Sequence, residues 1–158
     1  MLHRPRMILH SLGAVALSLG LAASALAGYK RADTIPTADL IQPAELAALL
    51  QKPKTAKPLI LQVGFRTLYA QAHIPDAEYA GPGGDNDGLK TLQERVAKLP
   101  RDQGIVLYCG CCPWDHCPNV AGAYETLRSL GFTQVKVLYI ANDFGTDWVN
   151  KGYPSTGS

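Results

Sequence analysis

Short apolar runs alternate with segments of helical periodicity along most of this sequence. The runs show little polar alternation, as buried strands of a parallel sheet do, and they fall at 58–63, 105–108 and 135–140. Apolar residues spaced three or four apart predict helices at 41–50, 88–99 and 119–130, with shorter helical segments at 65–72 and 146–150. Because the predicted strands and helices alternate and are joined by short links, we expect a three-layer α/β domain, with a mostly parallel central sheet and helices on both faces.

Glycine and proline mark the boundaries between these segments. Pro100 follows the helix predicted at 88–99, and Gly131 is placed to stop the helix at 119–130. Residues 78–86 are rich in glycine, and we expect them to be exposed and irregular. His73 lies in a bend, where a structural hydrogen bond is a more common role for histidine than catalysis.

Residues 1–27 have the composition of a secretory signal peptide. A basic start precedes an apolar stretch at 8–21, and residues 25–27 (ALA) provide the small side chains of a cleavage site. A bilayer span needs about 20 apolar residues, so an uncleaved membrane anchor is the alternative, but the Ala-x-Ala ending favours cleavage. We therefore expect an N-terminal arm at 28–36 and one folded domain at 37–158, located in the periplasm or secreted.

Charge is balanced once the signal peptide is removed. The whole chain has 15 lysines and arginines against 13 acidic residues. Arg4 and Arg6 lie in the signal peptide, so the mature chain is neutral when its histidines are uncharged. Because no basic field remains, we expect no nucleic-acid partner and no stable membrane contact after cleavage.

All four cysteines lie close together, between a predicted strand and a predicted helix. They are Cys109, Cys111, Cys112 and Cys117. Open α/β sheets bind ligands beyond the carboxyl ends of their strands, and the N-terminus of a helix favours an anion. A thiolate should therefore form here more readily than at the ordinary thiol pKa of about 8.5. The pattern predicts a chemical site at this loop.

Three other interpretations of the cysteines stay open. An exported protein often contains disulfides, but bridges within this loop would close only small rings and so would stabilise the fold little. Cys109 and Cys112 also form a Cys-x-x-Cys motif ahead of a helix, as in thiol–disulfide enzymes. Finally, the four thiols with His116 could bind zinc or copper(I), although structural zinc sites usually combine two separated pairs.

Several segments resemble the rhodanese-like family of sulfurtransferases. Residues 65–77 (FRTLYAQAHIPDA) are similar to the family's "VR…GHIPGA" segment, and the strand that ends in Tyr108-Cys109 is similar to its active-site strand. Residues 121–132 (AGAYETLRSLGF) resemble the helix after the active loop, and 148–154 (WVNKGYP) resemble the closing segment. The resemblance covers most of the mature chain and implies the rhodanese-like three-layer fold.

The chain departs from the family pattern at the site itself. Gln62 stands where the family usually has an aspartate, and Ala72 replaces the glycine before the motif histidine. The loop from Cys109 is about five residues longer than in a common single-domain rhodanese, and it contains no arginine. Family members that handle thiosulfate commonly hold its sulfonate with a loop arginine, so thiosulfate is a poor candidate for the donor.

The resemblance implies a persulfide-forming nucleophile, and Cys109 is the first choice because it directly follows the strand. Cys112 is the rival. The rest of the predicted active-site loop comprises Gly110, Cys111, Pro113, Trp114, Asp115, His116 and Cys117. Arg66 is a candidate anion clamp in place of the missing loop arginine. Another loop thiol could act as a resolving cysteine.

Together these observations predict a sulfurtransferase that moves sulfane sulfur through a cysteine persulfide to a thiol acceptor. The expected ligands are a small sulfur donor and a thiol acceptor, with no cofactor and no metal. One alternative is a periplasmic thiol–disulfide oxidoreductase that uses the loop cysteines. The other is a non-catalytic domain of the same fold that binds metal or a partner protein.

Overall fold

A computed structural model describes residues 31–53 and 57–157 of the protein. The expected signal peptide at 1–27 and its cleavage site lie outside the described residues. Among the helices of the described part, none is both long and apolar enough to cross a membrane.

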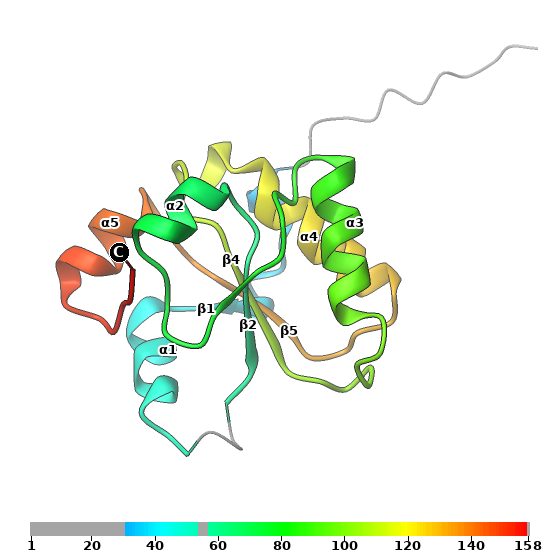
Figure 1. The fold of residues 1–158 in the computed structure, drawn as a ribbon, viewed down its shortest axis with the longest axis horizontal. Helices are drawn as coiled ribbons and strands as arrows, with labels where there is room; N and C mark the ends of the chain where they lie inside the picture. Colours follow the sequence, from blue (N-terminus) through cyan, green and yellow to red (C-terminus); the bar gives the residue numbers. More distant parts are fainter. Residues whose placement is uncertain (1–30, 54–56, 158) are drawn as a thin grey trace, which may run out of the picture.

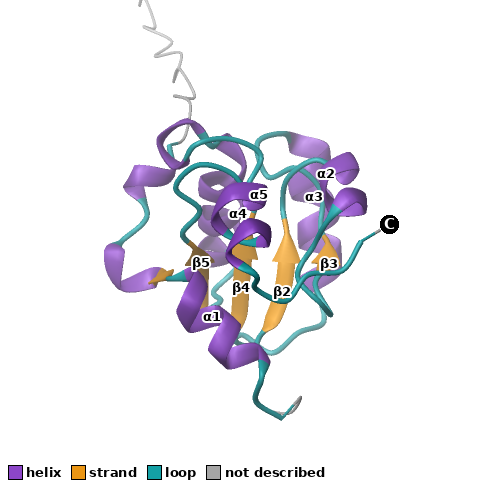
Figure 2. Ribbon diagram, turned by 90° about the vertical axis from the view of Figure 1, so that its left-hand side faces the viewer, coloured by secondary structure: helices purple, strands orange, loops and turns teal. Residues whose placement is uncertain are grey.

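The centre of the domain is a parallel sheet whose strands lie in the order β1-β5-β4-β2-β3. The strands are β1 (Leu40–Ile41), β2 (Leu59–Gln62), β3 (Glu78–Tyr79), β4 (Ile105–Tyr108) and β5 (Val135–Leu138). Each neighbouring pair is parallel, so all carboxyl ends meet at one edge of the sheet (Figure 2). β4 is the central strand, and the residue that follows it is Cys109.

Helices cover both faces of this sheet (Figure 1). They are α1 (Pro43–Leu50), α2 (Arg66–Gln71), α3 (Asn86–Val96), α4 (Pro118–Ser129) and α5 (Phe144–Asp147). The cores on the two faces are separate. α3 and α4 pack on one face and α1 and α5 on the other, as the two buried clusters show. The predicted α/β class, with a parallel sheet between two helical layers, is confirmed.

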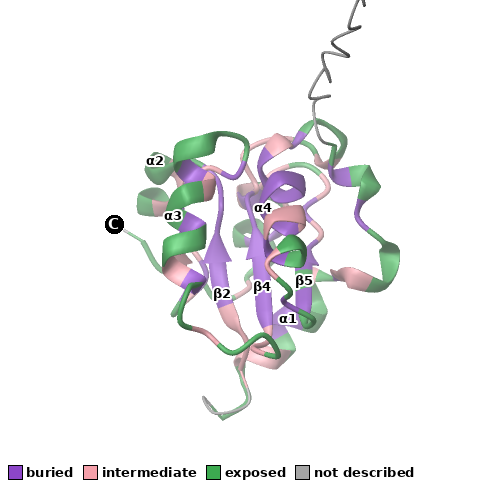
Figure 3. Cartoon of the chain, turned by 90° about the vertical axis from the view of Figure 1, so that its right-hand side faces the viewer, coloured by how far each residue is buried: buried purple, intermediate pink, exposed green. Residues whose placement is uncertain are grey.

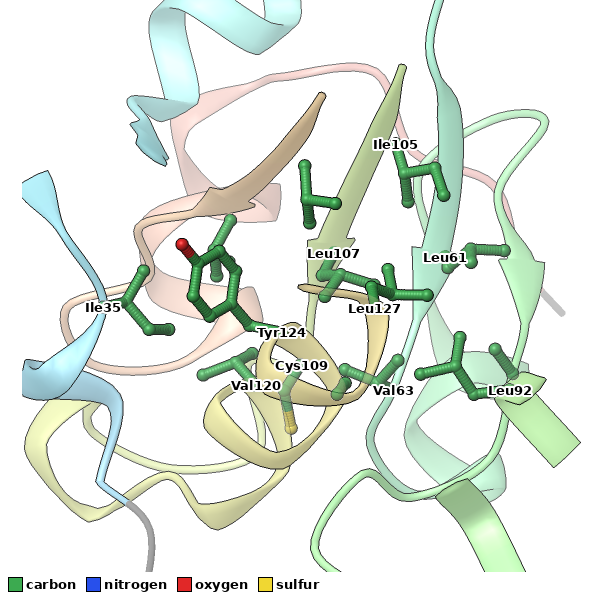
Figure 4. Packing of buried hydrophobic residues seen from close by; sticks show 14 of the residues in the cluster. Ile35, Leu61, Val63, Leu92, Ile105, Leu107, Cys109, Val120, Tyr124 and Leu127 are labelled. Carbon is green, nitrogen blue, oxygen red and sulfur yellow. The ribbon is translucent and has the colours of Figure 1, made fainter. Parts of the chain in front are cut away.

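Alternate residues of β4 supply both cores. Ile105 and Leu107 face α3 and α4, whereas Val106 and Tyr108 face α1 and α5. All four are buried, as expected for a strand in the middle of a parallel sheet (Figure 3). By the same alternation Cys109 points to the α4 side, where it lies beside Val120 in the cluster that Figure 4 shows.

The expected strands and helices are present, with ends that shift by a few residues. α3 begins at Asn86, two residues earlier than predicted, because the Asp85 carboxylate caps it by accepting from the Gly88 N–H at 2.7 Å. α5 likewise begins earlier, at Phe144, because Asp143 caps it through the Thr146 N–H at 2.8 Å. Gly131 follows α4 with φ of +87°, the left-handed conformation expected at its stop.

Two edge strands were not predicted. β1 overlaps the segment expected to be helical only at Ile41, and β3 lies within the segment expected to be irregular. Each has only two residues, which is too short for any hydrophobic period to show. Residues 31–36, expected to form an arm, bury Ala32 and Ile35 against the core on the α4 side.

Two glycines let the loop after β3 lie directly against α4. A Cβ on Gly122 would lie 2.1 Å from the Gly83 carbonyl oxygen, and a Cβ on Gly83 would lie 2.2 Å from the Asn119 carbonyl oxygen. No side chain larger than hydrogen fits at either position. The approach brings the Gly84 N–H to 2.9 Å from Asn119 Oδ1, so this loop fixes the first turn of α4.

This close approach makes the effect of Gly122→Ala testable. Alanine in a helix interior normally stabilises by about 1 kcal/mol relative to glycine. Here the added methyl group overlaps the Gly83 carbonyl, so we expect a net loss of about 1–3 kcal/mol in the free energy of unfolding, measured in urea. Gly104→Ala is the control, because the nearest atom to its added Cβ lies at an ordinary 3.7 Å. Stability of Gly122→Ala equal to wild type would contradict the packing described.

Candidate active site

The turn after β4 decides where the cysteines lie. Gly110 has φ of +70°, a conformation that side chains disfavour, and a Cβ there would lie 2.6 Å from Phe144 Cβ. Its carbonyl oxygen accepts a hydrogen bond from the Phe144 N–H at 3.1 Å. Gly110 therefore reverses the chain under α5, so that Cys111 returns to the end of β4 next to Cys109.

The N-terminus of α4 brings the fourth cysteine of the sequence to the same place. Cys117 is the residue that precedes the helix, and Pro118 occupies its first position, where a proline costs no hydrogen bond. Cys117 is buried, and the backbone N–H of Val120 acts to lower the pKa of its thiol. The helix N-terminus therefore points at the thiols, as predicted.

Three of the four thiols form one compact group. The Sγ atoms of Cys109, Cys111 and Cys117 all lie within 4.8 Å of one another. The Cys109 thiol donates to Cys111 Sγ at 3.0 Å, which is the shortest of the sulfur contacts described. Cys112 lies outside this group. Its Sγ is 3.2 Å from Cys111 Sγ and donates to the His116 carbonyl at 3.6 Å.

Asn119 is the polar side chain that orders the group. Its Nδ2 donates to Cys109 Sγ at 3.4 Å and to Cys111 Sγ at 3.5 Å, while its Oδ1 is held by the loop after β3. The side chain is buried, and both its donor and its acceptor atoms form hydrogen bonds, as buried polar groups generally do. Asn119 lies in the second position of α4, and its amide favours negative charge on the two sulfurs.

Gly64 leaves the space that the Cys109 sulfur occupies. A Cβ at this position would lie 2.7 Å from Cys109 Sγ and 2.9 Å from Gln62 Nε2. Gln62 replaces the aspartate usual in the family, and its Oε1 accepts from the Gly64 N–H at 3.2 Å. A neutral amide thus supports the turn after β2, where a carboxylate would repel a thiolate.

The hydrogen bonds among the thiols separate their pKa values. Donation to Cys111, contact with Cys117 and burial raise the pKa of Cys109 well above its ordinary value. The same hydrogen bonds from Cys109 and Cys117, received by Cys111, lower the pKa of Cys111 far below the ordinary value. For Cys117 the contact with Cys109 lowers the pKa, but the contact with Cys111 and burial outweigh it and the net direction is upward. The group therefore holds its first negative charge on Cys111.

A cavity of about 340 Å³ opens at this edge of the sheet and reaches the thiols. Cys109 and Cys111 line it together with the apolar side chains of Leu68, Phe144 and Val149. Cys109 is only 2% exposed, so a reactant meets it inside the cavity and not at the surface. Asp143 is the one charged residue among the lining residues described, and its carboxylate already caps α5.

The rest of the predicted loop lies outside the thiol group. Trp114 is half-buried and packs 5.0 Å from the ring of Tyr139. Asp115 and His116 are exposed and pair through Nδ1 at 2.7 Å, and this contact lowers the pKa of Asp115. Pro113 precedes the 3₁₀ turn Trp114–His116, which contacts another such turn at Ala32–Thr34 near the N-terminus.

Arg66, the candidate anion clamp, is engaged elsewhere in this structure. Its guanidinium lies 4.2 Å from the centre of the Tyr79 ring, and it lines a hollow beside the loop after β3. It is absent from the described residues that line the cavity at Cys109. The clamp role stays a prediction. His73 contacts the Tyr69 carbonyl through Nδ1 at 2.8 Å and stacks on the Tyr69 ring.

Sequence reasoning missed two partners of Cys109. It paired Cys109 with Cys112, whereas the thiol in contact with Cys109 is Cys111. Gly110, which lies between Cys109 and Cys111, could have indicated this contact, because a glycine readily adopts the left-handed conformation that turns the chain back within one residue. It also omitted Asn119, which looked like an ordinary start of a helix. The nucleophilic roles assigned to Cys109 and Cys112 stay predictions.

The position of Asn119 yields a test of the charge on the thiol group. Asn119→Asp replaces the amide donor with a carboxylate, which should raise the pKa of Cys111. We expect the pH at which alkylation reaches half its maximum rate to rise by one unit for each unit by which the pKa rises. The measurement is the rate of Cys111 alkylation by iodoacetamide against pH, located by peptide mapping. Asn150→Asp, at an exposed position, is the matched control and should leave the profile unchanged. An unchanged profile in Asn119→Asp would show that Asn119 does not stabilise the thiolate.

Comparisons with known proteins agree with this geometry. The rhodanese-like domain family matches residues 42–140. A rhodanese-like domain of the Alr3790 protein from Anabaena is 24% identical, with a TM-score of 0.57 over 76% of this chain and 80% of that one. The BH2092 protein from Bacillus halodurans is 23% identical, with a TM-score of 0.57 over 75% and 76%.

A third similar structure carries a different activity in its name. Ygr203w, a yeast protein tyrosine phosphatase of the rhodanese family, is 16% identical, with a TM-score of 0.50 over 75% of this chain and 91% of that one. A search of curated proteins gave no match. These likenesses establish the fold, and the family match spans well over half of the sequence. The chain belongs to the rhodanese-like domain family.

Proposed function

We propose that this protein transfers sulfane sulfur through a persulfide on Cys109 to a thiol acceptor. One observation carries the proposal. The Cys109 thiol lines a cavity beyond the carboxyl end of β4 and donates a hydrogen bond to Cys111, whose pKa this contact lowers. A nucleophile and a hydrogen-bond partner that controls its proton are thus adjacent inside one pocket.

In the first step, Cys109 attacks the outer sulfur of a persulfide donor, R–S–SH. The Cys109 proton passes to the R–S sulfur as the new S–S bond forms, and Cys111, which before the attack accepts the Cys109 hydrogen bond over the 3.0 Å contact, stays a thiolate. The S–S bond of the donor breaks, and its R–S fragment leaves with that proton as a free thiol. Atoms and charge balance: the products are the Cys109 persulfide and a free thiol, and the Cys111 thiolate is unchanged.

In the second step, the acceptor thiolate attacks the outer sulfur of the Cys109 persulfide. A bond forms between the acceptor sulfur and the sulfane sulfur, and the bond to Cys109 breaks. Cys109 leaves as a thiolate, for which the buried amide of Asn119 provides a hydrogen bond at 3.4 Å. No net oxidation occurs in the cycle, so sulfur transfer needs no cofactor.

The cavity favours a neutral or weakly charged donor. Its described lining contains no arginine or lysine, and residues 110–117 contain none either. A dianion such as thiosulfate would lose its hydration without gaining a cationic partner. We therefore infer that small organic persulfides are better donors than thiosulfate.

The sequence supports an extracytoplasmic site of action. The signal-like segment at 1–27 would export the chain and leave a mature protein that begins at Gly28. Acceptors there would be small thiols or the cysteines of other exported proteins. Intact mass of the protein recovered from the native envelope tests the cleavage step, since cleavage removes residues 1–27, whereas retention of those residues would favour an uncleaved membrane anchor.

A thiol–disulfide oxidoreductase is the second candidate. The sulfurs of Cys109 and Cys111 are already 3.0 Å apart, so a small movement would join them. Such an enzyme would cycle between dithiol and disulfide and carry no extra sulfur. A phosphatase activity like the one named for Ygr203w is not proposed, because no arginine is available in the loop to hold a phosphoryl group.

The test compares the intact mass of the reduced mature protein before and after incubation with a small organic persulfide. We expect a gain of one sulfur atom that dithiothreitol or cyanide removes. Cys109→Ser should abolish the gain. Cys111→Ser should still gain the sulfur, but because the contact with Cys111 raises the pKa of Cys109, its loss should shift the pH profile of the gain to lower pH.

The outcomes separate the candidates. Loss of the gain in Cys112→Ser, with Cys109→Ser unaffected, would make Cys112 the nucleophile. No gain in the wild type, together with a mass two hydrogens low that dithiothreitol restores, would contradict sulfur transfer and support the dithiol enzyme. A pH profile in Cys111→Ser equal to that of the wild type would show that Cys111 does not control the proton of Cys109.

A further inference from the structure

Sulfur transfer accounts for Cys109 and Cys111 but not for Cys117. Cys117 is buried, forms the N-terminal boundary of α4 and still lies within 4.8 Å of both other sulfurs. Neither step of the transfer uses it. A third thiol held in this position needs a separate explanation.

We propose that Cys109, Cys111 and Cys117 form a three-coordinate site for copper(I). Metal–thiolate bonds of about 2.3 Å, as in zinc sites, place the sulfurs of a trigonal site about 4 Å apart. The three Sγ atoms are already within 4.8 Å of one another, and the 3.0 Å contact of Cys109 with Cys111 has to lengthen by about 1 Å to reach that spacing. The backbone needs little rearrangement.

The donor set selects the ion. All three ligands are soft sulfurs, and the group contains no carboxylate or imidazole. Zinc in structural sites is almost always four-coordinate, whereas this group offers three atoms. Cys112, the nearest additional thiol, is turned toward the His116 carbonyl. Copper(I) accepts thiolates and lower coordination numbers, so it fits the group better than zinc.

The surroundings supply the hydrogen bonds that metal-bound thiolates require. Asn119 Nδ2 donates to the sulfurs of Cys109 and Cys111, and the backbone N–H of Val120 favours negative charge on Cys117. The hydrogen bonds from Asn119 fix the direction of two of the three ligands. The positive end of the α4 dipole offsets part of the negative charge of three thiolates.

Copper would compete with the sulfur-transfer chemistry because both use Cys109. A copper-bound Cys109 has no free electron pair positioned in the cavity to attack a sulfane sulfur. The metal-loaded protein should therefore neither form a persulfide nor react with thiol reagents at the three ligands. Copper binding itself does not depend on the protein being a sulfurtransferase.

The test titrates the reduced mature chain, without oxygen, with copper(I) supplied as its bicinchoninate complex, whose loss of colour reports transfer. We expect one copper per chain. Cys117→Ser should weaken binding by about tenfold or more, since even outer-shell changes at metal sites cost 10–100-fold. Cys112→Ser is the matched control and should bind copper as the wild type does.

A second readout identifies the ligands. Alkylation of the folded protein followed by intact mass should add two groups to the metal-free protein, on the half-buried Cys111 and Cys112, but only one, on Cys112, to the copper-loaded protein. Because Cys117 lies in the core, circular dichroism must show that Cys117→Ser folds. If it does not, the half-buried Cys111→Ser replaces it and should show the same loss.

Three results would overturn the proposal. They are no transfer of copper from the chelator, equal affinity in wild type and the ligand variant, or preferential binding of zinc with Cys112 also protected. Persulfide formation is measured separately on the metal-free protein. Failure of sulfur transfer is thereby distinguished from failure of copper binding.

Discussion

The hydrogen bond from Cys109 to Cys111 is the interaction on which the chemistry of this protein depends. Three features of the fold create it. β4 ends at Tyr108, Gly110 reverses the chain in a conformation that only glycine adopts easily, and α4 begins close enough for Asn119 to reach both sulfurs. The hydrogen bond stabilises negative charge on Cys111 and keeps the proton on Cys109. The two thiols therefore titrate as a pair.

This arrangement resolves a conflict between burial and reactivity. A thiol as buried as Cys109 is ordinarily inert, because burial disfavours its thiolate. In the proposed step Cys111 carries the charge while Cys109 keeps its proton, which leaves with the R–S fragment during the attack, so no free thiolate has to form first on Cys109 in the core. The apolar cavity wall then excludes water from the sulfane sulfur. Residues 110–117 contain no lysine or arginine that could stabilise the charge of an anionic donor.

The order of the main elements was predictable because β2, β4 and β5 are continuous apolar runs and the longer helices have clear hydrophobic periods. The two-residue strands β1 and β3 show neither pattern, and the sheet formed by the longer strands determines them. The position of the site was predictable for the same reason, since it follows the central parallel strand. The internal geometry of the loop was not. The contact of Cys111 with Cys109, and the reach of Asn119, depend on the φ of Gly110 and on the approach of Gly83 to α4, neither of which a residue spacing reveals.

The most direct measurement is a pH titration of the reduced protein by NMR with ¹³Cβ-labelled cysteine, which follows each of the four thiols separately. The account predicts that Cys111 is the thiolate at neutral pH, whereas Cys109 retains its proton until the solution is strongly alkaline. In Cys111→Ser the signal of Cys109 should change, because its hydrogen-bond acceptor is lost. Deprotonation of Cys109 before Cys111 in the wild type, or four thiols that titrate independently near the ordinary thiol pKa of about 8.5, would contradict it.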